Sequence, residues 1–280
     1  MERTAIRLGG VALSSSVMNA SGPRSAEKAE LIELAAQHRG AIVFKSCNRA
    51  GLEQPDNLKN RGVAHFVGVA GELIPQGKTI VGSVVGQSEE EIVEVAKTLD
   101  GAGVRIIELN LADDFVQNSV APFSSFDRLK GLVGKVRGEV QAAIAVKVPP
   151  KLAMEPRAIA DLFKSLRVQI VLCANDLPKD LEVDLKRESA AGAARTLSQV
   201  NAFYQVAEGL IDIVAVGGIN TGRDAYIAHL TGATAVQVGS ALIKEGAGAL
   251  ARIDRELDGL LAANDHAALN EIIGKLAFAG

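Results

Sequence analysis

Four side chains with chemical potential stand where short apolar segments of the sequence end. They are Lys45, Asn110, Lys147 and Asn175. A lysine in this position is costly to bury unless an anionic or carbonyl-rich partner receives its charge. The pattern predicts a site for a ligand that gains negative charge. The alternative is that the lysine head groups escape to water and have no chemical role.

Two glycine-containing pairs end the last two apolar segments of the chain. Gly217 and Gly218 occur in VGGINTGRDA, and Gly239 and Ser240 occur in VQVGSALIKEG. Glycine lets the backbone approach an anion closely, and successive N–H groups at a helix start bind phosphate. The pairs predict a phosphate site, with tight strand-to-helix turns as the alternative.

A third candidate lies in the stretch ELNLADDF, residues 108–115, where an apolar segment reaches Asn110 and then turns acidic. A carboxylate in a partly buried site can act as a general base. Asp113 is our candidate for that role, and a solvated loop acid is the alternative. Weaker candidates in and near the same region are His65, Ser119, Ser124 and Ser125.

Eight apolar, β-branched-rich segments must position these residues. They span 16–20, 41–45, 79–86, 105–110, 142–147, 169–175, 212–218 and 234–240. Segments with helical periodicity separate them, so the sequence predicts an α/β fold, a (β/α)8 TIM barrel, with continuous apolar strands because both faces are buried. A doubly wound open sheet is the alternative. In a barrel, the strand ends listed above would meet at the C-terminal face, where chemistry occurs.

The helical segments predicted between the strands include 26–38 and 88–103, the latter with Ser88 and Glu91 as a capping box. Further helices are predicted over 127–140, 154–167, 196–210 and 222–232. Residues 4–15 read as a short hairpin that floors the barrel, and 264–277 as an additional terminal helix. The whole of residues 1–280 is expected to form one domain.

Composition narrows the classes of function. The chain has 280 residues, 48% of them hydrophobic, and a formal charge of −3, which gives no electrostatic reason to expect nucleic acid or a membrane surface. No stretch approaches the roughly 18 apolar residues of a membrane helix. Cys47 and Cys173 form no cluster with each other or with histidine, so neither a metal site nor a disulfide is expected, and a reduced cytoplasmic setting fits.

The motifs MNASG, FKS, ELNL and VKVPP, with the long segment VAVGGINTGRDAYIAHLTGATAVQVGSALIKEG, resemble class 1 dihydroorotate dehydrogenases in order and spacing over almost the whole chain. The resemblance implies a barrel that carries FMN across its mouth. The implied isoalloxazine contacts are Ala20, Ser21, Lys45, Asn110 and Lys147. The implied phosphate contacts are Gly217, Gly218, Gly239 and Ser240, and the implied substrate contacts are Lys45, Asn110 and Asn175. Lys45 and Lys147 suit a flavin, which becomes anionic at its N1 and O2 edge when reduced.

The sequence departs from this family after ELNL. The family continues with Ser-Cys-Pro-Asn, in which the cysteine is the general base, whereas Asp113 stands at the cysteine's position here. Phe115 replaces an amide that contacts substrate, and Asp176 replaces the usual Ser or Thr. The family's substrate loop, rich in Asn, Met and Gly, is not recognisable in residues 61–76. Orotate is an anion, and added aspartates around its pocket would oppose it.

We therefore expect an FMN-dependent oxidoreductase with an altered small cyclic or carboxylate substrate, in which Asp113, Lys45 and Lys147 are the catalytic residues. Three alternatives remain: an authentic dihydroorotate dehydrogenase, a flavin-binding accessory protein, and a phosphate-binding barrel lyase or isomerase without flavin. The resemblance implies a homodimer. Any iron–sulfur centre would have to belong to an electron-transfer partner subunit, because the chain has no cysteine cluster.

Overall fold

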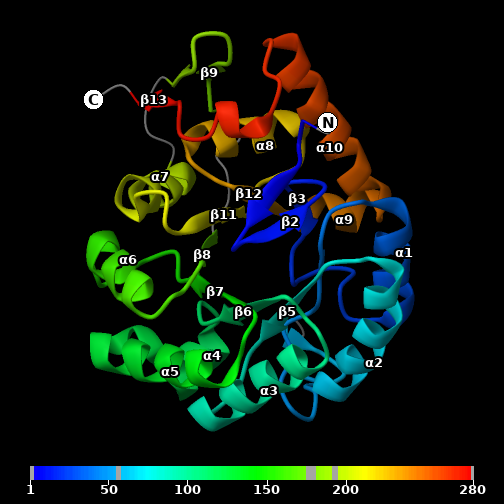
Figure 1. The fold of residues 1–280 in the computed structure, drawn as a ribbon, viewed down its shortest axis with the longest axis vertical. Coiled ribbons are helices and arrows are strands. Elements are labelled where there is room, and N and C mark those ends of the chain that lie inside the picture. Colours follow the sequence, from blue (N-terminus) through cyan, green and yellow to red (C-terminus); the bar gives the residue numbers. More distant parts are fainter. Residues whose placement is uncertain (1–2, 55–57, 175–180, 191–194, 279–280) are drawn as a thin grey trace.

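Eight parallel strands form the centre of the molecule in the computed structural model, which describes residues 3–54, 58–174, 181–190 and 195–278 (Figure 1). Their bounds are β3 Val17–Asn19, β4 Ile42–Val43, β5 Ile80–Val84, β6 Ile106–Asn110, β7 Ala143–Val148, β8 Ile170–Ala174, β11 Asp212–Val216 and β12 Ala235–Val238. Each falls within one of the eight predicted segments or overlaps it almost completely.

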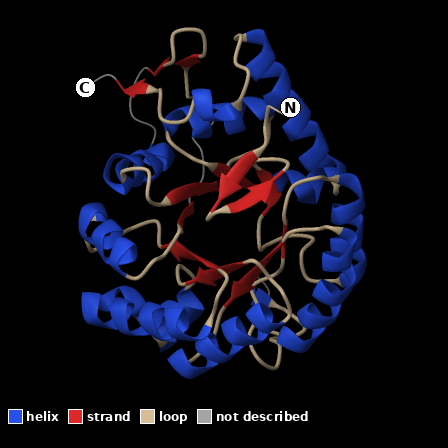
Figure 2. Cartoon of the chain, in the orientation of Figure 1, coloured by secondary structure: helices blue, strands red, loops and turns tan. Residues whose placement is uncertain are grey.

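The strands follow one another around a nearly closed barrel, in the order β3-β12-β11-β8-β7-β6-β5-β4. The two ends of this order, β3 and β4, are joined by the side chain of Asn19, which hydrogen bonds to the backbone of Val43. The predicted TIM barrel is therefore confirmed, and the open doubly wound sheet is excluded. Helices surround the barrel on its outer side (Figure 2).

A two-stranded hairpin, β1 Ile6–Leu8 and β2 Val11–Leu13, lies across one end of the barrel and confirms the predicted floor (Figure 1). Leu8, which is 1% exposed, packs into the inner core together with residues from the start of the strands. The turn needs glycine, because Gly9 has a φ of +56° and an added Cβ would lie 2.9 Å from the Cβ of Ala143. Its N–H donates to Asp212 at 2.7 Å.

The helices pack their apolar sides onto the outer faces of the strands. Their bounds are α1 Lys28–Gln37, α2 Val63–Leu73, α3 Glu89–Gly101, α4 Asp114–Ser119, α5 Phe126–Glu139, α6 Pro156–Ser165, α7 Arg195–Ala207, α8 Gly222–Thr231, α9 Ser240–Glu245 and α10 Gly248–Ala263. The six helices predicted between strands are confirmed. Sequence reading missed the short helices α4 and α9 and the longer helices α2 and α10.

The predicted capping box at α3 is half formed. Ser88 accepts a hydrogen bond from the N–H of Glu91 at 3.2 Å, as predicted. The carboxylate of Glu91 does not return to Ser88; it accepts from the N–H of Gln87 at 2.9 Å and from the side chain of Asn48. This glutamate therefore ties the β4–α2 loop to α3, a tertiary contact that competes with the local one.

The terminal helix predicted over 264–277 is wrong. That segment holds one 3-10 turn, η4 Leu269–Glu271, and ends in β13 Ala277–Phe278, which pairs with β10 Ser189–Ala190; β10 also pairs with β9 Val183–Asp184. Gly274 interrupts it at a φ of +75°, and an added Cβ there would lie 2.0 Å from the ring of Tyr204. The helix that covers this side of the barrel is α10, which ends just before the segment.

Candidate functional site

Polar side chains gather inside the barrel at the C-terminal ends of its strands. On β6, Ile107 and Leu109 belong to the outer core under the helices, whereas Ile106 belongs to the inner core. Alternation along the strand therefore turns Glu108 and Asn110 into the barrel interior. We call this end the barrel mouth. Its buried or half-buried polar residues are Ser21, Lys45, Ser46, Ser83, Glu108, Asn110, Lys147 and Gln237.

The two lysines predicted for the site do meet at the mouth. Lys45 is 7% exposed, and its Nζ lies 3.5 Å from the carbonyl of Gly22. Burial lowers the pKa of Lys45; the nearby Asp113 carboxylate opposes this effect, and the positive charge of Lys147 adds to it. Lys45 is therefore close enough to both Asp113 and Lys147 to be influenced by their charges, although the three residues come from separate segments.

Asn110 and Ser21 are fixed by hydrogen bonds within the mouth. The amide of Asn110 donates to Ser46 at 3.0 Å, and the hydroxyl of Ser21 donates to Glu108 at 3.1 Å. The backbone N–H of Ala20 donates to Val238 at 2.8 Å, which extends the pairing of β3 with β12. These residues are brought together, as predicted. Asn175, the remaining predicted substrate contact, lies outside the described residues.

The predicted phosphate residues lie at the ends of the neighbouring strands β11 and β12. Gly217 and Gly218 have φ angles of +96° and +73°, a backbone conformation that residues with side chains rarely adopt. Gly239 stands at the start of α9, whose first residue is Ser240, and an added Cβ at Gly239 would approach Ala20 to 3.9 Å. The two pairs thus form one glycine-lined edge beside the mouth.

Asp113 has a structural contact as well as its place near Lys45. Its Oδ1 accepts a hydrogen bond from the N–H of Phe115 at 3.0 Å and so caps α4. Asp114 is the first residue of that helix and is exposed. The two adjacent aspartates therefore differ in surroundings: only the first is half-buried at the mouth.

The weaker candidates are engaged in local contacts. His65 lies on α2, where its Nε2 is 3.1 Å from the carbonyl of Ala26. Ser119 and Ser124 donate to nearby backbone carbonyls, and Ser125 caps α5. Cys47 and Cys173 are buried, and burial raises the pKa of Cys47 to about 12. Neither thiol is suited to act as a base at neutral pH.

Sequence reading missed Ser83, Glu108 and Gln237 as members of the site. Ser83 and Glu108 are 0% exposed and Gln237 is 1% exposed, yet each interrupts an otherwise apolar strand. A polar residue in a strand that is buried on both faces requires a polar partner inside the protein. That interruption in GSV, IEL and VQV was the available signal.

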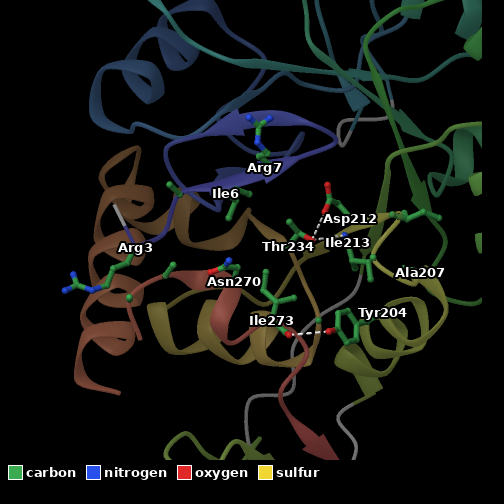
Figure 3. A pocket seen from close by; sticks show the side chains of 16 residues that line it. Arg3, Ile6, Arg7, Tyr204, Ala207, Asp212, Ile213, Thr234, Asn270 and Ile273 are labelled. Atoms are coloured by element: carbon green, nitrogen blue, oxygen red, sulfur yellow. Dashed lines mark hydrogen bonds between the residues drawn. The ribbon is translucent and has the colours of Figure 1, made fainter. Parts of the chain in front are cut away.

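A large cavity lies at the opposite end of the barrel. It has a volume of about 960 Å³ and opens near the starts of β11 and β12, with Ile6, Tyr204 and Asp212 among its lining residues (Figure 3). Thr234 donates to Asp212 at 3.2 Å, and the Tyr204 hydroxyl donates to the carbonyl of Ile273 at 3.3 Å. Catalytic groups of such barrels lie at the other face, so this cavity is not the candidate site.

The family model described as dihydroorotate dehydrogenase matches residues 56–261. A putative dihydroorotate dehydrogenase A (fumarate) of Streptococcus equi is 27% identical over 99% of both chains. The dihydroorotate dehydrogenase (fumarate) of Lachancea kluyveri is 29% identical over 92% of this chain and 93% of the relative. A crystal structure of ligand-free DHODH from Eimeria tenella superposes with a TM-score of 0.81 at 18% identity, covering 98% of this chain and 92% of the other.

No helix within the described part of the chain is long and apolar enough to cross a membrane.

Proposed function

Since the chain belongs to the dihydroorotate dehydrogenase family, we propose that it is an FMN-dependent oxidoreductase acting on a C–C bond of a small cyclic or carboxylate substrate. The observation that carries the proposal is the meeting of Lys45 and Lys147 with Asn110 at the barrel mouth, beside a glycine-lined edge. We propose further that residues 1–280 form one FMN-binding barrel domain.

FMN suits the residues at the mouth. Gly217 and Gly218 leave room for a phosphate to approach the backbone, and Gly239 with Ser240 begins a helix on the adjacent strand. The Oε1 atom of Gln237 is buried and has no hydrogen-bond partner among the described residues, which supports a bound polar group at this depth. Bound FMN would supply a ring that accepts a hydride reversibly.

Each of the proposed site residues then has a defined role. Lys45 and Lys147 place positive charge where a bound ring becomes anionic, so they stabilise the reduced state selectively. Asn110 orients ring and substrate by hydrogen bonding, and Asn175 is proposed to do the same for the substrate. Asp113 would receive the proton that leaves the substrate carbon when hydride is transferred.

Two features support a substrate other than dihydroorotate. The first is Asp113 at the position of the family's cysteine base. The second is a hollow of about 320 Å³ beside Lys45, with Glu27, Lys59 and Arg61 among its lining residues. Arg61 holds Glu27 through two hydrogen bonds of 3.0 Å. This charged wall lies where the chain leaves β4, and the family's substrate loop is not recognisable in the residues that follow.

The test is anaerobic reduction of the purified flavoprotein by a panel of cyclic and carboxylate metabolites, followed by visible absorption of the flavin. We expect a yellow protein containing FMN, which one compound of the panel bleaches much faster than dihydroorotate does. A colourless protein that does not bind added FMN would contradict the proposal and favour a barrel lyase or isomerase without flavin.

A second candidate is an authentic dihydroorotate dehydrogenase, because the relatives named above match over nearly their full length. Rapid bleaching by dihydroorotate would establish it in place of the altered substrate. A flavoprotein that no compound reduces would favour an accessory role instead.

A cytoplasmic homodimer, with or without an electron-transfer subunit, is part of the proposal and rests on the family alone.

A further inference from the structure

A carboxylate with only neutral partners lies at the centre of the mouth. Glu108 is 0% exposed, and its Oε1 accepts hydrogen bonds from the hydroxyls of Ser21 at 3.1 Å and Ser83 at 3.0 Å. Its Oε2 accepts from Nε2 of Gln237 at 2.8 Å. Among the described residues no lysine or arginine lies within 4.0 Å of it. In its ionised form the carboxylate of Glu108 only accepts hydrogen bonds, so every neighbour then turns a donor toward it.

This requirement fixes the direction of a chain of hydrogen bonds toward Asn110. Ser83 has one hydroxyl proton, and it gives that proton to Glu108. The bond of 2.9 Å between Ser46 and Ser83 must then use the proton of Ser46. The oxygen of Ser46 is left as an acceptor, so Asn110 must present its Nδ2 to it, at 3.0 Å.

Both amides of the mouth are therefore turned the same way. Asn110 points its NH2 group toward Ser46, and Gln237 points its NH2 group toward Glu108. No described residue hydrogen bonds to Oδ1 of Asn110, and Oε1 of Gln237 is buried without a described partner. An unpaired carbonyl oxygen at this depth is costly unless a ligand donates to it. The buried Oε1 of Gln237 thus calls for a donor such as a ligand N–H group, and Oδ1 of Asn110 has the capacity to accept another.

We propose that Glu108 is a positioning residue that turns Asn110 and Gln237 so that their carbonyl oxygens face a ring N–H of the bound molecule. Lysine donors and amide acceptors then stand side by side, which matches a cyclic imide, a ring in which N–H alternates with C=O. The identification of that ring as the pyrimidine part of a flavin rests on the proposed function. The hydrogen-bond chain itself does not.

Exchanging the residue types at the two ends of the hydrogen-bond chain, Glu108 and Asn110, tests the direction of its hydrogen bonds in the protein without ligand. Glu108→Gln replaces one accepting oxygen with an NH2 group, so either the Ser83 hydroxyl or the Gln237 amide must reverse its direction. Asn110→Asp removes the proton that Ser46 receives. We expect each single substitution to lower the melting temperature by several degrees. The double variant restores a consistent chain in reverse, from the introduced glutamine through Ser83 and Ser46 to the introduced aspartate. It should therefore be more stable than the sum of the two single losses predicts.

Removal of like-charge repulsion between two carboxylates could also produce such a rescue, so the same four proteins are compared in a Ser46→Ala background. That change breaks the chain and leaves both charges in place. We expect the rescue to disappear. A rescue of the same size without Ser46 would show that charge alone couples the two positions and would overturn the proposal.

The ligand half of the proposal is tested by titrating the apoprotein with FMN and following flavin fluorescence. Glu108→Gln should weaken FMN binding about tenfold, the effect of losing roughly 1.4 kcal/mol of hydrogen bonding. The matched control is Asp254→Asn. Asp254 is a buried acid away from the mouth that accepts from Thr4 and Ser15, at 2.7 and 2.8 Å, and pairs with Arg39 at 2.8 Å.

The outcomes separate this inference from the proposed function. An unchanged FMN affinity in Glu108→Gln, or an equal loss in Asp254→Asn, would contradict the positioning role toward flavin. An unmodified apoprotein that does not bind FMN would contradict the proposed function, and the exchange experiment would still decide whether Glu108 directs Asn110.

Discussion

Where the barrel closes, hydrogen bonds from the side chain of Asn19 to the backbone of Val43 replace backbone pairing between β3 and β4. The Nδ2 of Asn19 donates to the carbonyl of Val43 at 2.6 Å, and its Oδ1 accepts from the N–H of Val43 at 2.8 Å. One amide therefore satisfies both backbone groups at the junction of β3 and β4. The residues that follow it, Ala20 and Ser21, enter the mouth directly, so the closure also positions the site.

Replacing Asn19 with alanine should open this junction. Both backbone groups of Val43 would be left buried without partners, at a cost of about 1–3 kcal/mol each, so we expect a loss of roughly 2–6 kcal/mol in the free energy of unfolding. Urea denaturation measures it. Asn264→Ala is the control, because Asn264 donates to a single carbonyl at the end of α10. An equally small effect at both positions would show that the barrel closes without this side chain.

Replacing Gly218 with valine should lower FMN occupancy. The residue has a φ of +73°, which a β-branched side chain adopts only with strain, and its side chain would occupy the space that a phosphate needs. Gly209→Val is a matched control, because Gly209 has a φ of +71° in open space far from the mouth. We expect both variants to lose stability and only Gly218→Val to lose flavin. Full FMN content in Gly218→Val would remove these glycines from the phosphate site.

Replacing Lys147 with methionine should lower the reduction potential of the bound flavin while leaving much of the flavin bound. The lysine charge is most useful after the ring becomes anionic, so its loss penalises the reduced state selectively. Equilibrium titration against reference dyes measures the potential. Lys151→Met, at an exposed position of the following loop, is the control. A potential that is the same in both variants and in the unmodified protein would contradict the role of Lys147.

Replacing Asp113 with asparagine should slow flavin reduction by about 10²- to 10⁴-fold, the usual contribution of a general base. Asparagine caps helices as well as aspartate does, so the cap on α4 is retained, while proton transfer and the negative charge near Lys45 are lost. Stopped-flow absorption with the most effective reductant of the panel measures the rate. Asp114→Asn is the matched neighbour, and it should have little effect because Asp114 is exposed. Equal, mild effects at both positions would leave Asp113 as a helix cap alone.

His229 should make the protein less stable in mild acid. It is fully buried, its Nδ1 donates to Ala233 at 2.7 Å, and its Nε2 accepts from Ser16 at 3.1 Å. Burial lowers its pKa from 6.5 to about 4. Between these values the unfolded chain binds a proton and the folded chain does not, so stability falls as pH decreases from 6.5 to 4.

The difference of 2.5 units between those pKa values corresponds to a loss on the order of 3 kcal/mol. Urea denaturation at several pH values measures the slope. His229→Gln removes the titrating group, and its stability should depend less steeply on pH in this window even if it is less stable overall. An identical slope in both proteins would assign the acid sensitivity to other groups.

The sequence by itself determined the alternation of strands and helices. Apolar β-branched runs separated by helical periodicity are local features, and eight of them, such as 105–110 and 212–218, produced the eight strands of the barrel. The rule that parallel strands end at one face then predicted that Lys45, Asn110 and Lys147 would meet. The hairpin floor was also predictable, because Gly9 and Gly10 stand between two short apolar runs.

Secondary structure predicted from the local sequence pattern was wrong in two segments. The apolar spacing in 264–277 resembles a helix, but the packing of Tyr204 against Gly274 holds that segment in turns. Residues 61–76 were read as an altered loop, and they contain α2, which begins at Val63 after a glycine with a φ of +78°. For residues 264–277 the deciding neighbour, Tyr204, is distant in the sequence.

Only the tertiary structure decided how the polar groups of the mouth are paired. Glu108, Ser83 and Gln237 lie on three strands, and the stagger of the barrel, which no local pattern encodes, brings them within hydrogen-bonding distance. Because each hydroxyl has one proton and a carboxylate has none to give, that arrangement also fixes which atom of Asn110 faces Ser46. The sequence supplies the donors and acceptors; the closed barrel sets their direction.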